Sequence, residues 1–291
     1  MKSVSSKKLT RRDFVAKTAT AAASIQFLTH PIFGQNAPSN KLNLAGIGIG
    51  GMGKANLNNC SDENIVALCD VDPVFSEPVI SRYSNANFYG SYQEMLDTER
   101  DLDGVVIATP DHTHAVITQA AMDKNLHVYC QKPLTHTVHE ARVLTEAAAK
   151  APHIQTQMGN QGRSSESIRL LKEWLDAGAI GNVTEVYAWT DRPVGGQPWS
   201  TFPITGRPQD TPPVPKHLDW DRWLGPAPYR PYHPIYHPLS WRGFYDFGTG
   251  PLGDMGCHIL DPSFYALELG APTMVEATST HWEEAVLGET Y

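Results

Sequence analysis

A glycine-rich turn constrains the fold of this chain more than any other feature. Residues 46–53 read Gly-Ile-Gly-Ile-Gly-Gly-Met-Gly and follow an apolar run at residues 42–47. The spacing Gly48-x-Gly50-x-x-Gly53 predicts a strand, a tight turn and a helix whose N-terminus receives an anion. Gly48 permits the turn, Gly50 lets the backbone approach a pyrophosphate, and Gly53 allows close packing of helix on strand. These features together predict a dinucleotide site.

An acidic residue stands where such a site needs one. Asp70 follows the next apolar run, about 20 residues after the turn, where a carboxylate accepts hydrogen bonds from ribose hydroxyls. A carboxylate there also repels a 2′-phosphate, so NAD is favoured over NADP. A lone glycine triplet is often only a flexible loop, but strand, helix and acid in register favour cofactor binding. From this fingerprint, we expect the cofactor to contact Gly48, Gly50, Gly51, Met52, Gly53 and Asp70.

Short apolar runs alternate with helix-like stretches up to about residue 157. Runs of β-branched residues separated by helices indicate βαβ units and a parallel sheet. We therefore predict an α/β fold whose N-terminal domain, residues 38–160, is a Rossmann doubly wound parallel sheet. The expected strands are residues 42–47, 65–69, 105–109, 127–130 and 154–157, and the expected later helices are residues 91–96, 113–122 and 138–149.

The second half of the chain, residues 161–291, predicts a C-terminal α+β domain with a mostly antiparallel sheet. We expect helices at residues 164–177 and 252–269, the latter kinked or restarted at Pro262 with Asp261 as cap. The expected strands are residues 183–190 and 273–281. Two strands rarely stand alone, so this domain is expected to be incomplete and the chain truncated. Residues 193–238 hold twelve of the 22 prolines among aromatic residues, which indicates an ordered segment over a pocket.

The N-terminal segment has the features of a targeting signal. Residues 10–17 contain Arg11, Arg12 and Phe14 before an alanine-rich stretch, which resembles a twin-arginine export signal. The alternative is a basic tail. The signal implies the twin-arginine export machinery as a partner and a periplasmic or otherwise exported protein, with residues 1–37 forming the signal and linker. Because free NAD is scarce outside the cytoplasm, we expect a tightly held cofactor.

Composition excludes several classes. The net charge of −8 argues against nucleic-acid binding. No apolar stretch is long enough to span a membrane. The signal segment has no cysteine near its end to which a lipid could be attached. We therefore expect no stable membrane anchor. The four scattered cysteines are read as structural. His112 and His114 lack a third ligand, so no metal site is expected.

Three further motifs resemble the glucose–fructose oxidoreductase/inositol dehydrogenase (Gfo/Idh/MocA) family. Residues 128–134, Val-Tyr-Cys-Gln-Lys-Pro-Leu, are similar to the family's Glu-Lys-Pro strand end, residues 253–258 to its Asp-x-x-x-His pair, and residues 109–114 to its loop beside the nicotinamide. The chain departs from the family by carrying Gln131 in place of Glu and by its shorter length. The resemblance implies an active-site Lys132 and cofactor contacts from Thr109, Pro110, His114, Gln131 and Lys132.

The same residues suggest a chemistry. Oxidation of a secondary alcohol by NAD needs a base for the hydroxyl proton, and the imidazole of His258 titrates near neutrality. Asp254, four residues earlier on the same helix face, can hold that ring in one tautomer. Lys132 is expected to donate a hydrogen bond to the reacting oxygen. Weaker candidates for binding substrate are Asn160, Tyr232 and His233.

Three functions remain open at this point. The first is an exported NAD-dependent oxidoreductase acting on a sugar, glycoside or cyclitol hydroxyl. The second, known among relatives in the resembled family, is a redox-neutral NAD-dependent glycosidase that oxidises transiently, eliminates a leaving group and reduces again. The third is a non-catalytic nucleotide-binding fragment. Self-association into a homo-oligomer is also left open.

Overall fold

A sheet of six parallel strands forms the N-terminal half of the molecule. The computed structural model describes residues 41–190 and 207–278, and those after Lys41 belong to one compact unit. The strand order β3-β2-β1-β4-β5-β6 is that of a Rossmann fold, which confirms the predicted N-terminal architecture. The strands are β1 (Asn43–Ile47), β2 (Asn64–Cys69), β3 (Asn87–Tyr89), β4 (Gly104–Ile107), β5 (His127–Gln131) and β6 (Thr156–Gly159).

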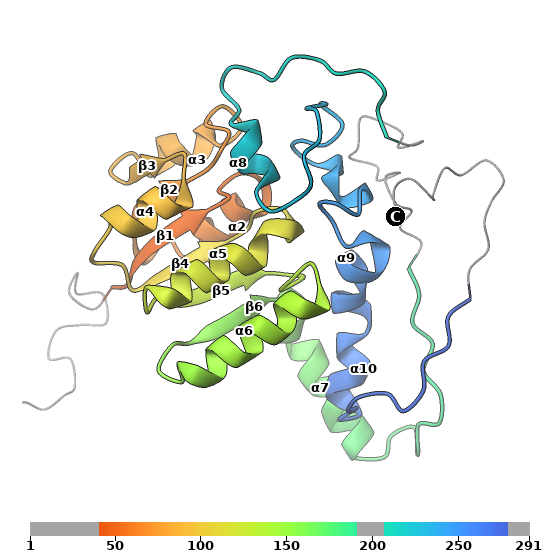
Figure 1. The fold of residues 1–291 in the computed structure, drawn as a ribbon. Coiled ribbons are helices and arrows are strands. Elements are labelled where there is room, and N and C mark those ends of the chain that lie inside the picture. The colour runs from red at the N-terminus through yellow and green to blue at the C-terminus, as the bar shows by residue number, and fades with distance from the viewer. Residues whose placement is uncertain (1–40, 191–206, 279–291) are drawn as a thin grey trace, which may run out of the picture. The chain divides into compact units, whose positions relative to one another are not determined.

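Helices cover both faces of this sheet (Figure 1). Each crossover places its helix according to local sequence signals: Ser91 caps one N-terminus, and Thr137 and Glu140 form a capping box at another. The helices are α2 (Gly51–Asn59), α3 (Glu77–Arg82), α4 (Tyr92–Thr98), α5 (Asp111–Asp123) and α6 (Val138–Lys150). All strands end at the edge where α2 and α5 begin, so that edge is where a ligand is expected.

The proline-rich part of the chain builds a second core out of aromatic side chains. Trp220 and Trp223 stack with ring centroids 4.5 Å apart, and Phe247 lies edge-on to Trp223. Buried aromatic pairs of this kind contribute beyond their area. This packing holds residues 218–238 of the predicted segment 193–238 in place, whereas its residues 193–206 lie outside the described residues. The buried members are Leu218, Trp220, Trp223, Leu224, Ile235, Tyr236, Trp241, Phe244 and Phe247.

The predicted long helix at residues 252–269 is two helices in the structure. Helix α9 (Gly250–Ile259) ends, and α10 (Asp261–Ala266) restarts with Pro262 in its first turn, where a missing N–H costs no hydrogen bond. The restart at the proline was predicted, but Asp261 as the cap was wrong. Asp261 is the first helical residue, and its Oδ1 lies 2.8 Å from Nη1 of Arg163. The remaining helices are η2 (Gln161–Ser164), α7 (Glu166–Asp176), α8 (Trp220–Leu224) and η3 (Ser240–Gly243).

The predicted antiparallel sheet is not seen among the described residues. Residues 183–190 and 273–278 form no strand, and residues 279–281 lie outside the description. Neither segment makes the ladder of backbone hydrogen bonds to a neighbouring strand that defines a β-strand. Their apolar side chains remain exposed, with Tyr187 and Trp189 each 78% accessible.

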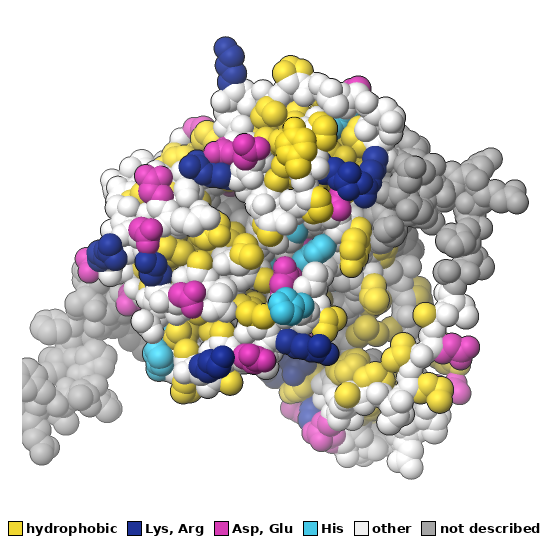
Figure 2. Space-filling view, viewed as in Figure 1, with side chains coloured by type: hydrophobic (Ala, Val, Ile, Leu, Met, Phe, Trp, Pro, Cys, Tyr) yellow, Lys and Arg dark blue, Asp and Glu magenta, His cyan; other side chains and the backbone are white. Residues whose placement is uncertain are grey.

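On the face shown in Figure 2, basic and acidic side chains are interspersed.

The residues of the proposed export signal, 10–17 and the alanine-rich stretch after them, lie outside the described residues. Among the helices that are described, none has the length and apolarity needed to cross a membrane. The four cysteines are free thiols.

Candidate active site

One cavity of about 980 Å³ runs along the edge where the strands end, and it gathers most of the residues singled out in the sequence. Its volume lies at the upper end of the range for ligand pockets. Side chains of the C-terminal half form its far wall, so the two halves of the chain share it. The predicted residues that line it are Gly48, Gly50, Gly51, Met52, Asp70, Thr109, Pro110, His114, Gln131, Lys132, Asp254 and His258.

The glycine turn has the geometry that its spacing predicts. Gly48 has φ +73°, and a Cβ there would lie 2.7 Å from the backbone nitrogen of Thr109. A Cβ on Gly53 would collide with the carbonyl oxygen of Gly48. Helix α2 can therefore pack this closely on the turn only because residue 53 is glycine. Gly53 itself does not line the cavity; it acts through this packing. The N-terminus of α2 faces the cavity through Gly51 and Met52.

Asp70 binds the backbone of the turn. Its Oδ2 accepts hydrogen bonds from the amides of Ile49 at 3.0 Å and Gly50 at 3.2 Å, and Oδ1 accepts one from the amide of Asp72 at 3.0 Å. Burial raises the pKa of Asp70 to about 6 despite these three bonds, because burial disfavours the charged form. The carboxylate therefore lies at the turn, where a ribose is expected, and changes charge close to neutral pH.

This pKa predicts how cofactor binding depends on pH. Below about pH 6 the free protein carries a neutral Asp70, which accepts hydrogen bonds more weakly than the carboxylate. We expect the Kd of NAD, measured by calorimetry, to rise about tenfold as pH falls from 7.5 to 5. The Asp70→Asn variant should bind more weakly at pH 7.5 and lose this dependence. An unchanged profile in the variant would show that another group is responsible.

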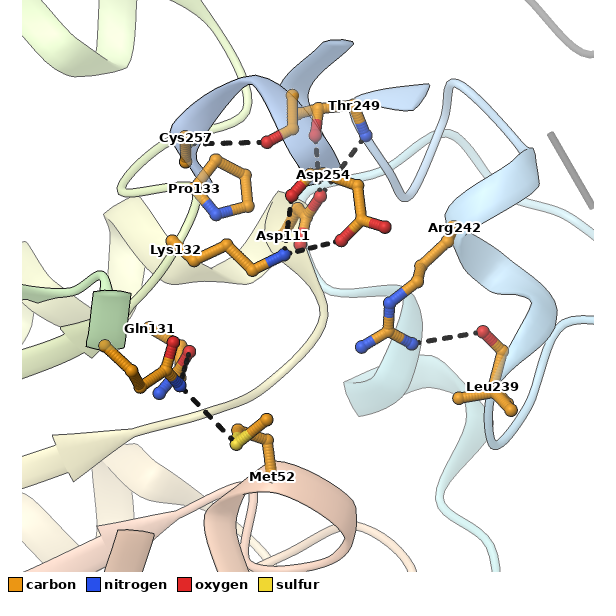
Figure 3. Close-up of polar contacts among 12 residues, drawn as sticks. Met52, Asp111, Gln131, Lys132, Pro133, Leu239, Arg242, Thr249, Asp254 and Cys257 are labelled. Atoms are coloured by element: carbon orange, nitrogen blue, oxygen red, sulfur yellow. Dashed lines mark hydrogen bonds and ion pairs between the residues drawn. The ribbon is translucent and has the colours of Figure 1, made fainter. Parts of the chain in front are cut away.

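Lys132 and Asp254 join the two halves of the chain at the other end of the cavity (Figure 3). Lys132 Nζ lies 2.5 Å from Oδ1 of Asp254 and 2.9 Å from its carbonyl oxygen. Both side chains are about 15% exposed, and a charge pair at this depth loses most of its hydration. Asp254 and His258 are four residues apart on α9, and both line the cavity. That Asp254 orients His258 stays a prediction; the Asp254 carboxylate contacts the ammonium of Lys132.

Gln131 connects the end of β5 to α2 and η2. It is buried, and its Nε2 donates to Oδ1 of Asn56 at 3.3 Å while its Oε1 accepts from Gln161 at 3.5 Å. An amide donates and accepts at once, whereas the Glu that the resembled family carries would only accept when ionised. Gln131 therefore supports this part of the cavity wall without adding charge beside Lys132.

Two residues that the sequence did not single out also line the cavity: Asp111 at the start of α5 and Arg242 in η3. Asp111 lines the cavity near Lys132, and its Oδ2 accepts hydrogen bonds from the backbone and hydroxyl of Thr249 at 3.2 and 2.9 Å. Burial raises its pKa. Arg242 also lines the cavity, and Figure 3 shows it facing the Lys132 and Asp254 side. Arg242 stands in no recognisable sequence pattern, whereas Asp111 lies within residues 109–114, the segment that resembles the family's loop beside the nicotinamide.

Three predicted substrate residues do not line the cavity. Asn160 donates through Nδ2 to the carbonyl of Cys257 at 2.7 Å, and Tyr232 packs edge-on against Trp220. His233 accepts at Nδ1 from the amide of Ile235 at 3.1 Å. The second of the two Tyr-His-Pro repeats reaches the cavity instead: His237 lines it, with Nε2 at 2.8 Å from Oδ2 of Asp72.

Comparison with known proteins agrees with this geometry. Residues 42–159 match the Gfo/Idh/MocA oxidoreductase family, NAD-binding Rossmann fold, and residues 165–288 match the C-terminal alpha/beta domain of the same family. The two matches together cover most of the chain, which belongs to the Gfo/Idh/MocA oxidoreductases. Its N-terminal domain is an NAD-binding domain.

Individual relatives share part of the chain. Inositol 2-dehydrogenase of Salmonella typhimurium is 29% identical over 48% of this chain and 43% of its own length. Levoglucosan dehydrogenase of Pseudarthrobacter phenanthrenivorans is 25% identical over 74% of this chain and 45% of its own length. A solved myo-inositol 2-dehydrogenase of Lactobacillus plantarum is 28% identical with a TM-score of 0.46, over 49% of this chain and 43% of that one. The chain spans less than half the length of these relatives.

Proposed function

We propose that this protein oxidises a secondary hydroxyl of a sugar, glycoside or cyclitol with NAD. One observation carries the proposal: a single cavity has the glycine turn and Asp70 at one end and Lys132, Asp254 and His258 at the other. The relatives named inositol 2-dehydrogenase and levoglucosan dehydrogenase support the substrate class. NAD, when bound, supplies the hydride acceptor.

The residues at the catalytic end have distinct roles in this proposal. His258 accepts the hydroxyl proton, since an imidazole is a base near neutral pH. Lys132 donates a hydrogen bond to the reacting oxygen, and its ammonium stabilises the negative charge that develops there. Asp254 holds Lys132 in place through the 2.5 Å contact, so the ammonium is directed before the substrate arrives.

We further propose that the nucleotide is held tightly and that the protein is exported. Arg222, Trp223 and His237 line the same cavity as Asp70, and the contact between His237 and Asp72 closes the wall beside it. Contacts from both halves of the chain would slow the release of a bound nucleotide. The paired Arg11 and Arg12 support transport by the twin-arginine machinery, which carries folded proteins with their cofactors.

The experiment first releases the nucleotide of the purified protein with acid and identifies it. The protein is then incubated with excess NAD and panels of cyclitols, sugars and glycosides. Accumulation of NADH at 340 nm supports the oxidoreductase. Release of free sugar from a glycoside without NADH would show that the protein is a redox-neutral glycosidase and not an oxidoreductase. NAD binding without turnover of any compound would show that it only binds the nucleotide.

A further inference from the structure

His114 occupies an unusual position beside the catalytic residues. It is 1% exposed, and both of its ring nitrogens face backbone carbonyl oxygens. Nδ1 lies 2.7 Å from the oxygen of Pro133, and Nε2 lies 2.8 Å from the oxygen of Thr109. A neutral imidazole has one N–H and one lone pair, so one of these short contacts would set a lone pair against a carbonyl oxygen. Only a doubly protonated ring satisfies both.

The surroundings of the ring support this charge. Burial lowers the pKa of His114, but the thiolate form of the neighbouring Cys130, the Asp111 carboxylate and the carbonyl of Pro133 outweigh it and raise the pKa to about 9. His112, two residues earlier, is a natural contrast. Both of its ring nitrogens also face carbonyl oxygens, but at the longer distances of 3.2 and 3.1 Å. At these distances a neutral ring keeps one hydrogen bond and tolerates the second contact, and burial lowers the pKa of His112 to about 4.

The two carbonyls belong to opposite parts of the site. Thr109 packs on the glycine turn at Gly48, and Pro133 directly follows Lys132. A ring bonded to both fixes the backbone that carries Lys132 relative to the cofactor turn. The same helix α5 begins with Asp111, which binds the backbone and hydroxyl of Thr249 just before α9. The first turn of α5 therefore contacts the supports of both Lys132 and Asp254.

We propose that His114 is a permanently protonated positioning residue that, together with Asp111, sets the distance between Lys132, α9 and the cofactor turn. The proposal rests on the proposed function for its catalytic consequence, but the charge state of His114 does not depend on it. His114 was expected to bind the cofactor; in this account it acts through Lys132 instead.

The charge state can be read directly by nitrogen NMR of the full chain labelled with ¹⁵N-histidine. At about pH 7.5 we expect one ring with two protonated nitrogens, missing from the spectrum of His114→Gln. If that variant does not fold, nuclear Overhauser contacts to Cys130 assign the ring in the wild type. A neutral His114 at this pH would overturn the proposal whatever reaction the protein performs.

The positioning role predicts a split between kinetic constants. In His114→Gln we expect kcat to fall about 10- to 100-fold, since a small misplacement of Lys132 costs that much, with KM and the Kd of NAD changed less than about threefold. The exposed His153→Gln is the matched control. Thr249→Val should lower kcat similarly, and Thr249→Ser, which keeps the hydroxyl, should restore it. If the wild type oxidises substrates and His114→Gln keeps the wild-type kcat, the positioning role is wrong. The proposed function and the charge state of His114 would not be affected by that result.

Discussion

Replacing Lys132 with methionine is expected to lower kcat by about 10³-fold or more while the protein still binds NAD. Methionine has nearly the volume of the lysine stem but no charge and no donor, so the reacting oxygen loses its stabilising partner. The Asp254 carboxylate would also lose the Lys132 ammonium, whose Nζ lies 2.5 Å from Oδ1. The effect should fall on kcat rather than on the Kd of NAD, because the ammonium acts on the substrate oxygen.

The control for this variant is Lys124→Met. Lys124 also pairs with a carboxylate, Asp97 at 2.6 Å, but both side chains are exposed, and such pairs contribute little. Its kcat should match the wild type. Steady-state NADH formation and calorimetric NAD binding, measured on both variants, separate catalysis from binding. A Lys132→Met variant within a few-fold of wild-type kcat would remove Lys132 from the chemistry.

Gly53→Ala is expected to abolish detectable NAD binding and to reduce the free energy of unfolding by about 1–3 kcal/mol. The added Cβ would collide with the carbonyl oxygen of Gly48, which is backbone and cannot rotate away. Helix α2 would have to move off the turn, and its N-terminal amides would no longer converge on the pyrophosphate.

Gly162→Ala tests whether the loss is specific to the turn. A Cβ on Gly162 meets nothing within 4 Å, so this variant should keep both stability and NAD affinity. Thermal denaturation and NAD titration of the two variants give the comparison. Normal NAD affinity in Gly53→Ala would contradict the packing account of the glycine turn.

The N-terminal domain could be predicted from sequence because its signals are local. β1, β2, β4 and β5 each contain a short apolar run whose C-terminal residues are buried, and these runs alternate with helices. β3 (Asn87–Tyr89) was not predicted, because its three residues are too few to show a period. Helix α3 was not predicted either, and the last strand was predicted about two residues early, since β6 is Thr156–Gly159.

The site was predicted only in part, for a different reason. Motifs identified Lys132 and Asp254 separately, but their pairing joins positions 122 residues apart and follows from the tertiary fold. Asp111 contacts a residue even further along the chain, a contact that its place in residues 109–114 did not indicate. Asn160 was assigned to the substrate because it follows the last strand, yet its amide binds the carbonyl of Cys257. Polar residues at a sheet edge serve structure as readily as ligands, and spacing alone does not separate the two.

Transfer of deuterium tests the central claim most directly. The protein, loaded with NAD, is mixed with substrates from the active panel that carry deuterium on the carbon of the secondary hydroxyl, and the nucleotide is analysed by mass after one turnover. We expect one deuterium on the reduced nicotinamide with the wild type and, in the same time, almost none with Lys132→Met, whose kcat is expected to be about 10³-fold lower. Turnover of the substrate without deuterium ever reaching the nucleotide would contradict it.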